Sequence, residues 1–105
     1  MNFNNLTIKS QEAIQQAQQL TMSQQQQAIE TGHILKGIFL ADENVVPFIL
    51  KKLNVHVARL NEVLDAVVTS YPKVSGGTPY LSHDSTAALQ KANLFHSFVK
   101  IIGNE

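Results

Sequence analysis

The stretch from Thr31 to Ala41, TGHILKGIFLA, decides the fold class of this chain. It contains one charged residue, and its large apolar residues recur at the spacings of three and four that align side chains along a helix. These apolar residues are Ile34, Leu35, Ile38 and Phe39. A helix that is apolar on most sides lies inside a bundle. We therefore expect a central, buried helix here, capped at Glu30 or Thr31.

The segment before this helix predicts another helix, which begins near Thr7. Thr7 is a candidate N-cap, because its hydroxyl can accept from an unpaired backbone N–H. The apolar or small residues fall on one helical face, and glutamines fill the other. The residues of the apolar face are Leu6, Ser10, Ala13, Ile14, Ala17, Leu20 and Thr21. The polar run from Ser23 to Gln27 is expected to be a solvated loop.

Two more helices are expected after the central one. Residues 42–44 form a turn and a cap, and a third helix then covers about residues 45–53, with Pro47 tolerated in its first turn. Asn54 occupies the position where a helix end favours a left-handed residue. The expected core side of the third helix is Val46, Ile49, Leu50 and Leu53. A fourth helix over about residues 57–69 has the stripe Val57, Leu60, Leu64 and Val67 or Val68.

The segment 71–81 is expected to be a linker, because its prolines and paired glycines break regular structure. A fifth helix begins after Ser82, with Asp84 in its first turn to suit the helix dipole. Its apolar side is Ala88, Leu89, Ala92, Phe95 and Val99. No alternating pattern predicts a strand. The chain is therefore expected to be an all-α bundle of about five helices.

The fifth helix repeats the pattern of the first at an offset of 75 residues. Ala88, Leu89 and Ala92 correspond to Ala13, Ile14 and Ala17, and Ser85 corresponds to Ser10. Together with the broken linker, this suggests an internal repeat. We expect a first four-helix repeat at residues 1–70, a linker at 71–81, and the start of a second, pseudo-symmetric repeat at 82–105, comprising one helix and a divergent tail.

Composition excludes several classes of protein. The 105 residues contain 8 Lys plus Arg and 8 Asp plus Glu, so the formal net charge is zero. A nucleic-acid-binding protein, such as a small helical DNA-binding domain, usually has a basic surplus. The chain has no cysteine, no signal-peptide pattern and no apolar run long enough for a membrane span. We expect no nucleic acid or membrane partner, and a cytoplasmic protein.

No catalytic or metal-binding constellation is visible in the sequence. No phosphate-binding glycine loop or Gly-x-Ser-x-Gly elbow is present. His33, His56, His83 and His96 lack metal-ligand spacing, and a single histidine ahead of an apolar helix, such as His33, is usually a hydrogen-bonded structural residue. We expect no enzymatic activity, no cofactor and no metal.

Several ordered segments together resemble the N-terminal repeat domain of the Clp/ClpB family of AAA+ ATP-dependent chaperones. They are Leu6-Thr7, then Ala13, Ala17 and Leu20, the run from Ile29 to Leu35, the run from Val46 to Leu53, and the linker Tyr71 to Gly77. The resemblance covers about residues 1–93 and breaks off within the second repeat. It departs from the family at Gly32, because relatives that recognise phosphoarginine have an acidic residue before the histidine.

The resemblance implies a non-catalytic domain, flexibly linked to AAA+ ATPase modules, that holds unfolded or aggregated client proteins for disaggregation during the stress response. In some family members the same domain docks adaptor proteins. Thr7 matches a threonine implicated in client binding. Leu89 and Phe95 are candidate groove residues on the fifth helix, although core packing would also account for them.

Two alternatives stay open at this point. The chain could instead be an oligomerisation or adaptor-docking domain without a client groove. The tail is also unusually apolar, and large apolar patches usually mark a partner, so we expect self-association or a domain swap through it. The tail residues concerned are Leu94, Phe95, Phe98, Val99, Ile101 and Ile102.

Overall fold

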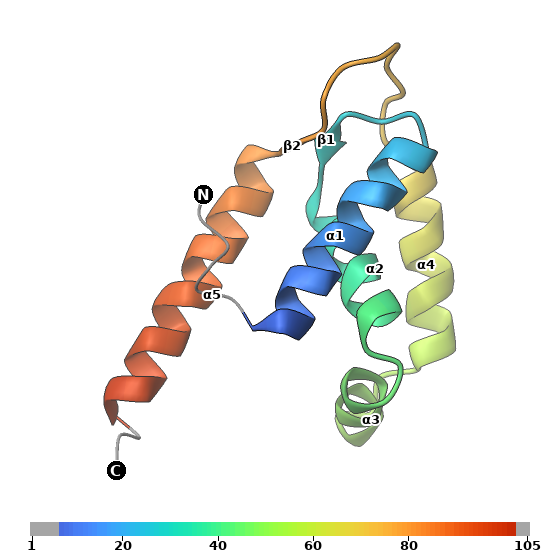
Figure 1. Cartoon of the computed structure of the whole chain (residues 1–105). Coiled ribbons are helices and arrows are strands. Elements are labelled where there is room, and N and C mark those ends of the chain that lie inside the picture. The colour runs from blue at the N-terminus through green and yellow to red at the C-terminus, as the bar shows by residue number, and fades with distance from the viewer. Residues whose placement is uncertain (1–6, 103–105) are drawn as a thin grey trace.

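The computed structural model describes the backbone of residues 7–102 and the side chains of residues 7–94. Over this range five helices and two short strands are present (Figure 1). The prediction of an all-α fold is therefore confirmed. The elements are α1 (Ile8–Ser23), β1 (Ala28–Ile29), α2 (Thr31–Ala41), α3 (Val45–Lys52), α4 (Val57–Ser70), β2 (Tyr80–Leu81) and α5 (His83–Ile102).

Helix α2 lies at the centre of the bundle, between α1 and α4 (Figure 1), and has the predicted bounds. It packs closely on α1 because the contact is made by small residues. Ala13 and Ala17 are buried on α1, and a Cβ atom added at Gly37 of α2 would collide with the Ala13 carbonyl oxygen. The two helix backbones therefore touch at a place where only glycine fits. The remaining buried apolar residues are Ile14, Ile29, Phe39, Leu64 and Val68.

The prediction of a core side for α3 was wrong, because none of the residues of this helix is buried. Ile49 and Leu53 were expected inside, yet they are 50% and 67% exposed. Val46 and Leu50 are half-buried. The short connections orient this eight-residue helix across the end of the bundle, so only part of its surface meets the core. In α4 the stripe was predicted well, and of the two candidates Val68 is buried while Val67 is exposed.

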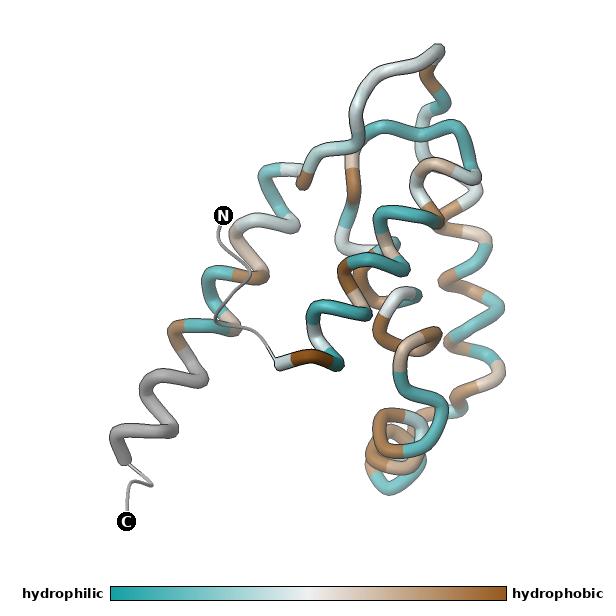
Figure 2. The backbone as a smooth tube through the Cα atoms, viewed as in Figure 1, coloured by the Kyte–Doolittle hydropathy of each residue, from teal (hydrophilic) through white to brown (hydrophobic). Residues whose placement is uncertain are grey.

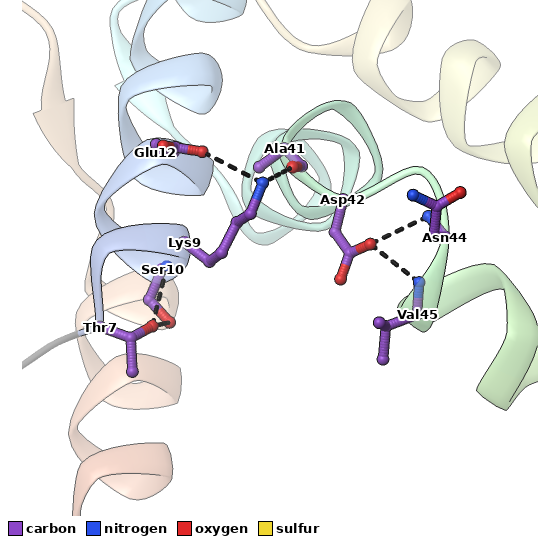
Figure 3. Close-up of polar contacts among 8 residues, drawn as sticks. All are labelled: Thr7, Lys9, Ser10, Glu12, Ala41, Asp42, Asn44 and Val45. Carbon is purple, nitrogen blue, oxygen red and sulfur yellow. Dashed lines mark hydrogen bonds and ion pairs between the residues drawn. The ribbon is translucent and has the colours of Figure 1, made fainter.

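Side-chain caps fix where three helices begin. Thr7 Oγ1 accepts from the Ser10 backbone N–H at 3.1 Å, as predicted. Asp42 Oδ1 accepts from the N–H groups of Asn44 and Val45 at 2.9 Å each, which holds the start of α3 (Figure 3). His56 Nδ1 accepts from the Arg59 N–H at 3.1 Å and caps α4, a role that was not predicted. Asn54 has φ 63°, the left-handed conformation predicted for it.

The segment predicted to be a linker is attached to the loop after α1. Strands β1 and β2 pair in parallel, with Ala28 opposite Tyr80 and Ile29 opposite Leu81. The Val74 N–H donates to the Gln25 carbonyl at 2.8 Å, which holds the segment upstream of β2. The sequence did not indicate these strands, because two residues are too few to show an alternating pattern.

The start of α5 repeats the cap of α1. Ser85 N–H donates to Ser82 Oγ at 3.1 Å, and the two hydroxyl oxygens are 3.0 Å apart. The Thr7 and Ser10 hydroxyls, 75 positions earlier, lie at the same 3.0 Å separation. Only the second cap is buried, and there Ser85 Oγ also donates to the Ile29 carbonyl at 2.7 Å. This bond joins the first turn of α5 to β1.

Replacing Ser85 with alanine is expected to weaken the attachment of the first turn of α5 to β1. The variant loses a buried hydrogen bond that contributes about 1 kcal/mol. Amide hydrogen exchange in the first turn of α5 should therefore become about fivefold faster. Ser10→Ala is the matched control, because Ser10 has the same cap position but is exposed. Equal effects of the two substitutions would contradict the role given to the bond between Ser85 and Ile29.

Candidate functional site

A hollow of about 430 Å³ lies between α1, the two strands and α5. The two helices meet the sheet at one end of the molecule, and α5 then runs away from the bundle (Figure 1). The lining combines apolar and polar groups: Ile14, Gln18, Ile29, Pro79, Tyr80, Leu81 and Thr86. Tyr80 is 55% exposed at its edge. The hollow therefore offers hydrogen-bonding groups beside a smaller apolar surface.

The predicted site residues lie along the two helices that border this hollow. Thr7 caps α1 and is exposed, seven positions before Ile14, so both lie on the same side of the helix. Leu89 is half-buried and stands three positions after Thr86, on the corresponding side of α5. Phe95 belongs to α5, but its side chain lies outside the described residues. Neither Thr7 nor Leu89 is among the lining residues of the hollow. Thr7 lies at the start of α1, near the end of α2, where Lys9 Nζ donates to the Ala41 carbonyl (Figure 3).

The apolar side of α5 is largely open in the described residues. Ala88 and Ala92 are exposed, whereas Ala13 and Ala17, their counterparts on α1, are buried against α2. Leu94 is 71% exposed. Within the described residues, no element covers α5 as α2 covers α1. The predicted self-association through the tail falls mainly on side chains beyond Leu94, outside the described residues.

A buried polar network under α2 explains His33. Its Nδ1 accepts from the Glu30 backbone N–H at 2.9 Å, so the proton of the neutral ring is on Nε2, which lies 2.6 Å from Gln26 Oε1. Gln26 Nε2 donates in turn to the carbonyls of Val68 and Tyr71. Burial lowers the pKa of His33, and the Glu30 carboxylate opposes this shift in part. The network ties together the loop after α1, α2 and the end of α4.

His33 therefore has the structural role predicted for it, but its partners were missed. Gln26 stands in the glutamine run that was expected to be solvated, yet it is buried. Nothing in the sequence distinguishes it from its neighbours. Tyr71 packs against His33 with ring centroids 4.9 Å apart, and its hydroxyl occupies the space that any side chain at position 32 would need. Gly32 thus has a packing reason, because a side chain at this position would displace the end of the Tyr71 side chain.

Neither a metal-binding group of side chains nor a membrane-spanning helix is found among the described residues. Within them, no group of three His, Cys, Asp or Glu side chains is placed to hold a metal ion. Among the helices of the same range, none is both long and apolar enough to cross a bilayer.

The five helices, the paired strands and the buried His33 network define a small helical domain. Residues 5–99 match the family described as the Clp repeat (R) N-terminal domain. The chain belongs to this family, as its sequence suggested. No solved structure matches the chain.

The similar curated proteins are chaperones named ClpB. The chaperone protein ClpB of Bacteroides thetaiotaomicron is 50% identical over 105 residues, which is 100% of this chain and 12% of that protein. The ClpB of Porphyromonas gingivalis is 45% identical over 92 residues, 88% of this chain and 11% of that protein. The ClpB of Bdellovibrio bacteriovorus is 38% identical over 72 residues, which is 69% of this chain and 8% of that protein. The chain thus spans about a tenth of the length of these relatives.

Proposed function

We propose that this chain is the non-catalytic, client-binding domain of a ClpB-type chaperone. It holds unfolded or aggregated segments of other proteins, and AAA+ modules elsewhere in the parent protein supply the ATP-driven work. The observation that carries the proposal is the open hollow between α1 and α5, with exposed apolar surface continuing along α5. Membership of the family and the chaperone names of the relatives support it.

The proposed mechanism is differential binding of unfolded over folded protein. An unfolded segment exposes apolar side chains and unpaired backbone groups, which a folded protein buries. Tyr80 and Leu81 contact the apolar side chains, while Gln18 and Thr86 offer hydrogen-bonding partners to the backbone. The contact area is small and ordering the client opposes binding. Binding is therefore weak, which suits a domain that must release its client to the ATPase.

The arrangement of helices supports a division of the chain at the linker. In this proposal residues 1–70 form a first repeat and residues 82–105 begin a second one, with Thr7 and Ser82 as equivalent helix caps. The client would then lie along the boundary between the two repeats, where Thr7, Leu89 and Phe95 are the proposed contacts.

Replacing Leu89 with serine is expected to weaken client binding about fivefold, because half a leucine side chain contributes about 1 kcal/mol when it is buried by a ligand. The measurement is fluorescence anisotropy of a labelled, permanently unfolded polypeptide titrated with the domain. Val63→Ser is the matched control, since Val63 is 43% exposed on α4, away from the hollow. The same loss of affinity in both variants would contradict the proposed site.

The same titration separates the proposal from its alternative, an oligomerisation or adaptor-docking domain. A client-binding domain prefers the unfolded polypeptide to the same polypeptide in its folded form. A docking domain binds a folded partner and shows no such preference. Equal affinity of the domain for the two forms would therefore overturn the proposed function.

A further inference from the structure

Helix α3 presents an apolar stripe to solvent, at the end of the bundle away from the hollow (Figure 2). Val45, Phe48, Ile49 and Leu53 follow the spacing of one helical face and are 58%, 59%, 50% and 67% exposed. Together they expose apolar surface on the order of 400 Å², which is the size of the largest patch on a typical monomer and is often functional. We call these four residues the α3 stripe.

A depression adjoins the α3 stripe. It has a volume of about 780 Å³ and lies between α3 and the start of α4, with Pro47, Phe48 and Val57 among its lining residues. Phe48 thus borders both the stripe and the depression. Lys52 Nζ stands 5.4 Å from the centroid of the Phe48 ring and shields part of it. One face of the molecule therefore carries both a protruding aromatic ring and a concave surface beside it.

The charges at the two ends of α3 are opposite. Glu43 precedes the helix and is exposed, and Asp42 beside it accepts the capping hydrogen bonds (Figure 3). Lys51 and Lys52 are exposed in the last turn. Within the described residues, Glu43 and these two lysines take part in no ion pair. The nearby cations are already engaged, because Lys9 pairs with Glu12 at 3.6 Å and Arg59 with Glu62 at 3.7 Å.

We propose that the α3 stripe is a self-association surface, on which a second copy of this chain packs with its own α3 antiparallel to the first. In this arrangement Glu43 of each copy faces Lys51 and Lys52 of the other, at both ends of the contact. A parallel arrangement would bring like charges together. A twofold interface also needs a self-complementary face, and Phe48 of each copy can enter the depression of the other.

The size of the surface sets the strength of this association. Two stripes bury about 800 Å² in total, which is less than the roughly 1,200–2,000 Å² of a stable, specific interface. The association is therefore weak, and it is favoured where copies are held close together, since tethering raises the effective concentration to about the millimolar range. This inference does not depend on the proposed client site, because no residue of α3 is among those that line the hollow.

The test uses two charge variants that cannot pair with themselves. Lys51→Glu/Lys52→Glu has acidic residues at both ends of α3, and Glu43→Lys has only basic residues exposed there. We expect sedimentation equilibrium at low salt to show a concentration-dependent mass for the natural chain, a monomer for each variant, and restored association in an equimolar mixture of the two. Phe48→Ser should also abolish association, while Met22→Ser, which removes an equally exposed residue on α1, should not.

Three results would overturn the proposal. The natural chain could remain monomeric at about 1 mM, the effective concentration that tethering supplies. The mixture of variants could associate no more than either variant alone. Alternatively, an unfolded polypeptide could bind α3 more tightly than a second copy does, which would assign the stripe to clients instead.

Discussion

Replacing Gly37 with alanine is expected to destabilise the domain by about 3 kcal/mol, the upper part of the range for overpacking a core. The added Cβ would collide with the Ala13 carbonyl oxygen and lie 3.0 Å from the Ala17 nitrogen, and both are backbone atoms. The clash can be relieved only if α1 moves away from α2, which opens the close backbone contact between the two helices. The gain of about 1 kcal/mol in helix propensity from glycine to alanine offsets only part of this loss.

Urea unfolding followed by circular dichroism measures this effect. Gly32→Ala is the matched control, because it lies in the same helix and its Cβ would meet the end of the Tyr71 side chain, which can move. We expect that variant to lose clearly less stability than Gly37→Ala. If Gly37→Ala is as stable as the natural chain, the close approach of α1 and α2 described above is wrong.

Acidification is expected to destabilise the domain through His33. Burial lowers the pKa of this histidine in the folded state, so the unfolded chain binds the proton more readily. Protonation of Nδ1 would also remove the hydrogen bond that this nitrogen accepts from the Glu30 N–H, because both groups would then be donors. Stability is therefore highest above the unfolded pKa of about 6.5 and falls as the pH drops below it, by at most about 1.4 kcal/mol per pH unit. The decline levels off once the pH passes the folded-state pKa.

Urea unfolding between pH 7.5 and 5 gives this slope. His33→Gln removes the titrating ring while keeping hydrogen-bonding capacity, and should flatten the decline between pH 6.5 and 5. Where that variant is too unstable to analyse, NMR of the natural chain replaces it, since the His33 ring should stay neutral at pH values where exposed histidines have titrated. An His33 ring that titrates at or above its ordinary pKa in the folded protein would contradict the network.

Helix bounds and caps could be predicted because their causes are local. The apolar spacing of residues 31–41, the hydroxyl of Thr7 and the left-handed Asn54 each act within one or two turns of chain. The packing of α1 on α2 follows from the same small residues that suggested the family. Such features need only the sequence around them.

What could not be predicted depends on contacts between distant segments. Gln26 is buried because three partners, His33, Val68 and Tyr71, form hydrogen bonds with its amide. No local sequence pattern indicates this burial. The paired strands are too short to alternate. The stripe on α3 has the spacing of a core face, but it faces solvent because the connections around α3 orient the helix, not because of its own residues.

The candidate site was predicted in part. The resemblance placed Thr7 and Leu89 on the helices that border the hollow, and whether they bind clients stays a prediction. The hollow itself was missed, since its lining comes from α1, both strands and α5, which come together only in the fold.

The most direct test of the proposed function is an NMR titration of the domain with a permanently unfolded protein, followed residue by residue. The account predicts chemical-shift changes that cluster at the start of α1, around Ile14, and from Tyr80 to Leu89, with Leu89→Ser reducing them and Val63→Ser leaving them unchanged. No shift from a folded domain at about millimolar client, the weak end of the affinity scale, would contradict it. So would shifts confined to α4.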